Sequence, residues 1–212
     1  MKLPSRSAFT LIEMLTVMAV IAILASLVVA VQAFAQRKAA TARADGEIHT
    51  MSASCESYKG DFGGYPRDVG SGTTGTSETD KLNPRVEGNP ANYQKACLVL
   101  YKALSGDANA DGKAKEKGYC EFPPNQLNKN SSGEIRFIQD PFGNSYGYST
   151  AGAKAEEDYR GKLQTNPQEP RPTKDLQGFS PNFDLWSTGG VVNKSTKETD
   201  LDSDRKRWVK NW

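Results

Sequence analysis

The chain has 212 residues, of which 37% are hydrophobic and 25% are charged, and its formal net charge is +2. That length accommodates one membrane helix and one soluble domain. A charge this close to neutral, with lysines scattered along the chain, excludes the basic field of a nucleic-acid-binding protein, so no nucleic acid is expected as a partner.

The first predicted element is an apolar helix over residues 9–35. It follows a basic leader, residues 1–8, and its only charge is Glu13, the fifth residue counted from Phe9. A helix of that length spans roughly 40 Å, more than the ~30 Å hydrocarbon core of a bilayer. The run is longer than the apolar region of a secretory signal peptide and lacks an A-x-A cleavage motif. We therefore expect it to stay with the mature protein.

Glu13 is an unusual residue for a membrane helix. A carboxylate costs about 2.5–3.5 kcal/mol at the bilayer centre and less near the interface, so an intramembrane acid indicates a function and a partner. The alternative is that Glu13 only marks the helix start, where the helix macrodipole favours a negative charge.

The same helix is predicted to continue over residues 36–60, because a narrow apolar seam at helical period follows the membrane run. Its members are Ala44, Ile48, Met51, Cys55 and Tyr58. Gly60 and the Gly63-Gly64 pair mark its end. Residues 9–64 contain no proline, so nothing in the sequence forces a kink.

A second helix is predicted from Asn89, with Pro90 in its first turn and Gly106 at its end. Its buried stripe is expected to be Tyr93, Ala96, Cys97, Leu100, Tyr101 and Leu104. Residues 70–80, rich in Gly, Thr and Ser, are predicted to form a loop.

The remainder is predicted to form short antiparallel strands. They lie around Ile135 and Phe137, over residues 145–149 and over residues 182–187, and Asp140-Pro141-Phe142-Gly143-Asn144 has the chemistry of a turn between them. The predicted fold class is therefore α+β.

Residues 7–13, Ser-Ala-Phe-Thr-Leu-Ile-Glu, resemble the start of the type IV pilin superfamily, which includes the pseudopilins of type II secretion. The turn at residues 140–144, the Asp-Leu-Trp-Ser strand and the Asn211-Trp212 ending resemble the major pseudopilins of secretion most closely. The resemblance covers residues 7–66 and 140–212 and leaves residues 67–139 unmatched. It implies a pilin-like fold, in which a long N-terminal helix packs on a small antiparallel sheet in a globular domain, residues 61–212, that ends in a C-terminal loop.

The resemblance also implies a processing and assembly site. Prepilin peptidase would cut between Ala8 and Phe9, and Phe9 would become N-methylated. Glu13 would then pair with the N-terminal amine of a neighbouring subunit. The family usually has Gly where this chain has Ala8.

Several partners and a location follow from the resemblance. The partners are like subunits in a homopolymer, the prepilin peptidase, an inner-membrane assembly platform, minor pseudopilins and the membrane itself. Lys2 and Arg6 favour a cytoplasmic N-terminus, with the globular domain in the periplasm of a bacterium. The expected function is a type II secretion pseudopilus that drives protein export. The alternatives are a type IV pilin of a surface filament for adhesion, motility or DNA uptake, and a membrane-tethered calcium-binding module that never polymerises.

Two acidic stretches are candidates for calcium, the only cofactor expected. Major pseudopilins hold calcium in the loop before their final Trp, and Asp200, Asp202 and Asp204 occupy that region here. The weaker alternative is Asp107, Asn109 and Asp111, which have the spacing of the first half of an EF-hand loop but lack the Glu at its twelfth position. The simpler interpretation of both stretches is a solvated loop.

Three cysteines, Cys55, Cys97 and Cys120, allow at most one intrachain disulfide. An oxidising compartment favours a bridge, and we take Cys97–Cys120 as the working pair, although the sequence does not choose among the pairings.

We expect no enzymatic activity. His49 is the only histidine and is predicted to be solvated on the long helix, which disfavours Ser/His and Cys/His nucleophile sites. Residues 70–75 lack the Lys of a phosphate-binding loop, and the cysteines do not have zinc spacing.

Overall fold

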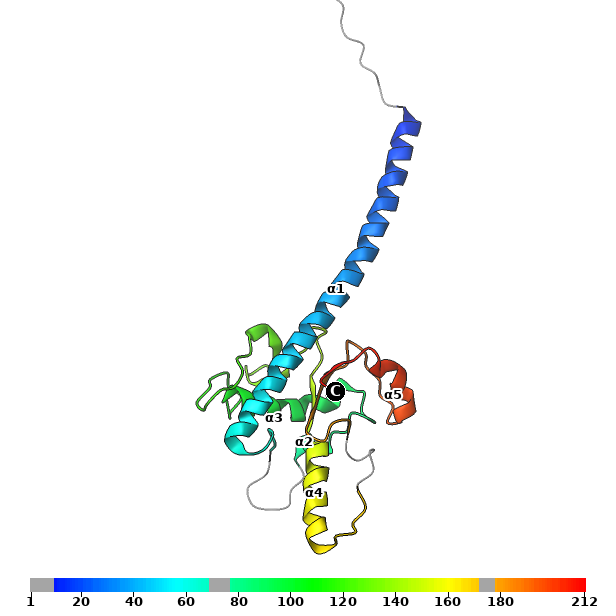
Figure 1. Ribbon diagram of the computed structural model, residues 1–212. Helices are drawn as coiled ribbons and strands as arrows, with labels where there is room; N and C mark the ends of the chain where they lie inside the picture. The colour runs from blue at the N-terminus through cyan, green and yellow to red at the C-terminus, as the bar shows by residue number, and fades with distance from the viewer. Residues whose placement is uncertain (1–9, 69–76, 172–177) are drawn as a thin grey trace, which may run out of the picture. The chain divides into compact units, whose positions relative to one another are not determined.

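The computed structural model describes residues 10–68, 77–171 and 178–212 (Figure 1). It divides into two compact units, Met1–Ala40 and Thr41–Trp212, and the second is called the head unit below. Helix α1, Leu11–Phe62, begins in the first unit and ends in the second.

In the first unit, the described large apolar side chains of α1 are exposed. They include Leu11, Ile12, Leu15, Met18, Ile21, Ile23, Leu24, Leu27, Val28, Val31 and Phe34. The helix has no break between its ends, as the absence of proline predicts.

In the head unit, the predicted seam of α1 is confirmed as a buried face. Ala44, Ile48, Met51 and Cys55 are at most 2% exposed, and Tyr58 packs against the same core. The helix ends two residues later than Gly60, at Phe62. A glycine inside a helix costs only about 1 kcal/mol, whereas Gly63 adopts a φ of 75°, a left-handed conformation that closes the helix.

The second predicted helix is also confirmed. It consists of a 3₁₀ turn, η1 (Pro90–Tyr93), capped by the Asn89 side chain, and of α3 (Gln94–Ser105). All six residues of its predicted stripe are buried. Gly106, with a φ of 72°, closes the helix and lies so close to the backbone of Glu116 that a Cβ would collide with it.

The strands form two small antiparallel sheets. One pairs β1 (Leu127–Lys129) with β2 (Ile135–Ile138), and the other has the order β3 (Gly147–Ser149), β4 (Asp184–Ser187), β5 (Val209–Lys210). Gly147 lies opposite Trp186 in the β3–β4 register, and a Cβ on Gly147 would meet the indole ring.

The predicted turn at residues 140–144 connects the two sheets and is held by Asp140. The N–H groups of Phe142 and Asn144 donate to its Oδ1 at 3.0 and 2.8 Å, and the Ser187 hydroxyl donates to its Oδ2 at 2.5 Å. Asp140 is 4% exposed, so this buried carboxyl links the turn to β4.

Two apolar clusters form the core. The larger one joins the α1 seam and the α3 stripe to side chains of β2, β3 and β4, among them Ile138, Tyr148 and Leu185. The smaller one contains Leu82, Tyr93, Ala96, Trp186 and Trp208, with Trp212 packed against it. A long helix followed by a small antiparallel-sheet domain confirms the predicted α+β class.

Three helices of the head unit were not predicted from the sequence. Glu78–Lys81 is a helical turn, α2, inside the stretch predicted as a loop, of which residues 70–76 lie outside the described ranges. Helix α4, Ala151–Thr165, occupies part of the stretch predicted to be strands. Helix α5, Glu198–Arg205, lies within the stretch predicted as a C-terminal loop, and Figure 1 shows it on the other side of the head from the loops that follow α3.

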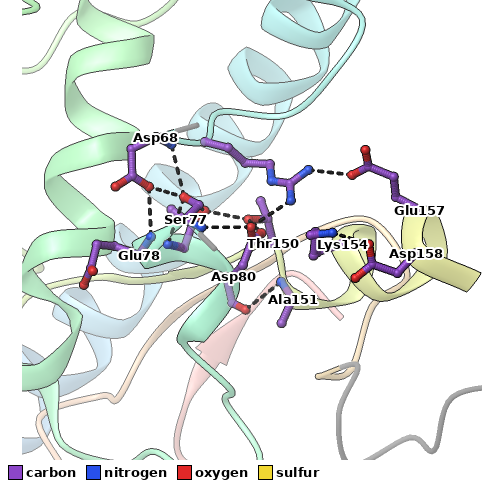
Figure 2. A network of polar contacts seen from close by, with 12 residues as sticks. Asp68, Ser77, Glu78, Asp80, Thr150, Ala151, Lys154, Glu157 and Asp158 are labelled. Atoms are coloured by element: carbon purple, nitrogen blue, oxygen red, sulfur yellow. Dashed lines mark hydrogen bonds and ion pairs between the residues drawn. The ribbon is translucent and has the colours of Figure 1, made fainter. Parts of the chain in front are cut away.

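A polar network ties α2 to the start of α4 (Figure 2). Asp80 accepts hydrogen bonds from Arg67 Nη2 and from the Thr150 hydroxyl, both at 2.7 Å, and its side chain is 1% exposed. The Thr79 and Thr150 hydroxyls are 2.6 Å apart. A second guanidinium nitrogen of Arg67 reaches the exposed carboxylate of Glu157 at 3.0 Å. This network fixes the chain just after α1 to the head.

Candidate functional site

The start of α1 is organised by a reciprocal pair of contacts between Thr10 and Glu13. Glu13 Oε2 accepts hydrogen bonds from the Thr10 N–H at 2.7 Å and from the Thr10 hydroxyl at 2.8 Å. The Glu13 N–H in turn donates to the Thr10 hydroxyl at 3.3 Å. This is a capping box, in which two otherwise unpaired donors at a helix start are satisfied by each other's side chains.

Thr10 is a residue that the sequence reasoning missed. The signal was present, because Thr10-Leu11-Ile12-Glu13 has the S/T-x-x-E spacing of a capping box before an apolar run. The geometry therefore gives Glu13 a local structural role in addition to the predicted assembly role.

Within the described ranges, no Lys or Arg side chain pairs with Glu13; its side-chain contacts are those with Thr10. The Glu13 carboxylate therefore lies at the start of an apolar helix without a cation partner among the described residues. The predicted cleavage pair, Ala8 and Phe9, lies outside the described residues.

The surface around Glu13 is apolar on every side of the helix. Leu11 is 83% exposed, Met18 68% and Val28 64%. By length and composition α1 qualifies as a candidate membrane span, near the N-terminus. Such a surface is stable only when lipid or other apolar helices cover it.

The three C-terminal aspartates do not converge on one point. All lie on α5, where Asp200 Oδ2 accepts from the Ser195 hydroxyl at 2.6 Å and Asp204 Oδ2 accepts from the Asn193 amide at 2.8 Å. Asp202 pairs with Arg205. Each carboxylate therefore has a partner from its own chain, and the calcium set at Asp200, Asp202 and Asp204 stays a prediction.

The loop that begins at Asp107 uses its first carboxylate as a hydrogen-bond acceptor. Asp107 is 1% exposed and accepts from the Gly112 N–H at 2.7 Å, the Tyr101 hydroxyl at 2.9 Å and the Asp111 N–H at 3.2 Å. Burial acts to raise the pKa of Asp107, but these donors outweigh it and hold the pKa below its usual value. Asn109 is exposed, and the Asp111 carboxylate accepts from the Lys113 N–H at 2.9 Å and lies 3.9 Å from Lys115 Nζ. Among the described residues, no group of three or more His, Cys, Asp or Glu is arranged to hold a metal ion.

The three cysteines are free thiols in the structure. Cys97 is fully buried and accepts the Ile138 N–H at 3.3 Å, while Cys120 lies partly exposed near Ser54. Burial raises the pKa of the Cys97 thiol to about 11, which keeps it unreactive near neutral pH. The structure does not form the Cys97–Cys120 bridge, and the pairing stays a prediction.

His49 is placed as the sequence predicted. Its side chain is 76% exposed on α1, with Nε2 3.8 Å from Asp45 one turn earlier. This is an ordinary surface pair, and the geometry around His49 gives no support to nucleophilic catalysis.

Comparison with known proteins concerns the start of the chain. Residues 3–29 match a family model described as the prokaryotic N-terminal methylation motif. The motif is typical of type IV pilin-like proteins, a structural rather than an enzymatic family, and it indicates a substrate of prepilin peptidase. The matched range includes Ala8, Phe9 and Glu13 and does not reach the head unit. No curated protein and no solved structure matches the chain.

Proposed function

We propose that the chain is a subunit of a filament of the type IV pilin kind, cut between Ala8 and Phe9 and assembled through α1. The observation that carries the proposal is Glu13: a charged residue at the start of an exposed apolar helix, inside a matched methylation motif, with no cation partner among the described residues.

In the proposed mechanism, the apolar surface of α1 contacts first the membrane lipid and then the helices of other subunits. Before assembly, the apolar stretch from Leu11 to Phe34 holds the subunit in the membrane. Cleavage then frees the amine of Phe9, four residues before Glu13 in the sequence. During extraction from the membrane, Glu13 of one subunit pairs with the amine of a neighbour, in surroundings where an unpaired charge is expensive. The apolar helices pack against one another and form the core of the filament, with the head units outside.

Within this class we favour the pseudopilus of type II secretion, a periplasmic piston that pushes exported proteins outward. The support is the resemblance at the turn of residues 140–144 and at the Asn211-Trp212 ending. The competing function is a surface pilus, which the long stretch at residues 67–139 favours. Location of the gene beside secretion genes supports the first, and location beside a twitching-motility retraction motor supports the second.

The proposal is tested first by mass spectrometry of the N-terminal peptide from membranes of the native host. We expect a peptide that starts at N-methylated Phe9. An intact Met1 in cells with a working prepilin peptidase would mean that Ala8 blocks the cut, and the proposed assembly would be wrong. Such a chain would be a membrane-anchored domain that does not polymerise.

A further inference from the structure

The C-terminal segment, residues 191–208, docks on the turn at residues 83–88. The Asn193 N–H donates to the Gly88 carbonyl at 3.1 Å, and Leu201 of α5 is fully buried. A Cβ on Gly88 would collide with the Leu201 side chain, so the turn and the helix are in direct contact.

Arg205 lies at the centre of this contact, with its side chain only 7% exposed. Its Nη1 donates to the Arg85 carbonyl at 2.7 Å, and its Nη2 donates to the Glu198 carbonyl at 3.0 Å. The same guanidinium pairs with the Asp202 carboxylate and lies 3.7 Å from Glu198 Oε1. One buried cation is therefore surrounded by two backbone carbonyls and two carboxylates.

That set of oxygens is of the kind that binds Ca²⁺. Here a side chain of the protein occupies it. We propose that Arg205 is the internal cation that holds the C-terminal segment on the head, and that the segment needs no calcium.

The charge balance supports this proposal. Arg85 Nη1 pairs with Glu198 Oε1 at 2.8 Å, so two guanidinium groups face the carboxylates of Glu198 and Asp202. Two positive and two negative charges cancel, and a divalent cation added among them would be uncompensated in a partly buried site.

A second layer of contacts fixes both guanidinium groups in place. Arg85 Nε donates to the Gly178 carbonyl at 2.7 Å. The Cζ atoms of Arg85 and Arg205 lie 4.5 and 5.4 Å from the centre of the Phe179 ring, within the range of cation–π attraction. Arg205 thus joins α5 to the turn before η1 and to the chain before β4, two segments that are far from it in sequence.

The test compares the full-length chain in detergent micelles with Arg205→Ala and with a matched control, Arg207→Ala. Arg207 is the same residue type two positions later but is exposed. Thermal unfolding is followed by tryptophan fluorescence, because Trp186, Trp208 and Trp212 all belong to the cluster beside this segment. Each protein is measured in EDTA and in excess CaCl₂.

We expect Arg205→Ala to lower Tm by on the order of 10 °C, since it removes the buried guanidinium that donates to the Arg85 and Glu198 carbonyls and pairs with Asp202. Arg207→Ala should leave Tm unchanged, and the wild-type Tm should be the same in EDTA and in calcium. A calcium-dependent rise of the wild-type Tm, or equal Tm values for the two variants, would overturn the proposal. The result does not depend on filament assembly.

If Arg205→Ala does not fold, Arg205→Lys keeps the charge and loses the planar fork that contacts two carbonyls at once. We then expect a lower Tm than wild type and faster protease cleavage within residues 191–208. Cleavage and Tm equal to wild type would overturn the proposal.

Discussion

The two halves of helix α1 use hydrophobic residues in opposite ways. In the first unit the described large apolar side chains surround the helix and are exposed; Ile21, for example, is 55% exposed. In the head unit a narrow seam carries the apolar residues, and Ile48 is 1% exposed. The same residue type in the same helix therefore finds its partners outside the chain in one half and inside it in the other.

The two halves of α1 need different coverings in order to be stable. An apolar seam on one face of a helix is buried by a sheet and a second helix of the same chain. An apolar surface on all faces is covered only by lipid or by other copies of the helix. A filament whose subunits wait in a membrane supplies both coverings in succession, which is why we propose that function.

The same contrast holds for two carboxylates. Asp80, in the head, has Arg67 as its cation partner, and its side chain is almost fully buried. Glu13, in the apolar half, has only the capping contacts with Thr10 among the described residues. Four predictions test whether the two parts of the molecule differ in this way.

The largest expected effect is that of Glu13→Ala on assembly. We expect the variant to be cleaved and held in the membrane but to lose polymer by more than about 100-fold, because the neighbour's amine loses its partner and each 1.4 kcal/mol is a factor of ten. The measurement is the ratio of chain in sheared filaments to chain in membranes of the native host.

Thr10→Ala is the matched control for that experiment. It removes the capping partner, at a cost of about 1 kcal/mol, and keeps the Glu13 carboxylate. Filaments should persist in this variant. Equal loss of filaments in both variants would show that Glu13 acts only as a helix cap.

Asp80→Ala tests the buried ion pair between Asp80 and Arg67 in the head. We expect the free energy of unfolding to fall by about 3–5 kcal/mol, since the change leaves the partly buried Arg67 guanidinium without its closest anion. Glu157→Ala removes the other carboxylate that contacts Arg67, which is 66% exposed, and should cost less than about 1 kcal/mol. Chemical denaturation in micelles measures both; a smaller cost for Asp80→Ala than for Glu157→Ala would contradict the structure.

Ile48→Ala and Ile21→Ala compare the two halves of α1 directly. Ile48→Ala should lower the free energy of unfolding of the head by about 2–5 kcal/mol, because it opens a cavity in the larger cluster. Ile21→Ala should leave it unchanged. Thermal melts of the two variants in the same detergent decide this, and a similar Tm loss for both would mean that the first half of α1 also packs against the head.

The smallest effect concerns the pH dependence of the head through Asp184. Burial raises the pKa of this carboxyl to about 6, although the N–H groups of Phe179 and Ser180 and the charge of Arg85 lower it. Because the folded state holds the proton more tightly than the unfolded chain, this stabilisation is complete below about pH 4 and is lost as the pH rises through 6. Between pH 4 and pH 7 this contribution changes by about 2 kcal/mol.

The measurement is Tm between pH 4 and pH 7. We expect the contribution of Asp184 to make the wild-type head more stable at the lower end of this window, and Asp184→Asn to reduce the difference. Asp45→Asn, a change at a carboxylate that is 56% exposed, should leave the pH profile as it is. A profile that Asp184→Asn does not alter would mean that the carboxyl titrates normally.

Strong periodicity made much of the fold predictable. The seam of α1 and the stripe of α3 were read correctly because a buried helical face leaves its spacing in the sequence. Helix α4 was not predicted because it has almost no apolar face. Its sequence does carry the charge spacing of a helix, as in the pairs Lys154–Asp158 and Glu156–Arg160, each four residues apart.

The contacts of Arg205 in the C-terminal segment could not be predicted from the sequence. The alternating aspartates resemble a calcium loop, and no local pattern predicts a role for Arg205. Arg205 instead contacts the carbonyl of Arg85, 120 residues away in sequence. No local pattern encodes a contact of that separation.

The sequence by itself determined the apolar helix and its lone acid, the buried faces of α1 and α3, and the turn at residues 140–144. Each depends on spacing or on residue chemistry within a few positions of the chain. Tertiary packing settled which partner each charged side chain takes: Arg67 for Asp80, Arg85 for Glu198, and none of the described cations for Glu13. The physical reason is that ion pairing depends on distance in space and on burial, both of which are set after distant segments have packed.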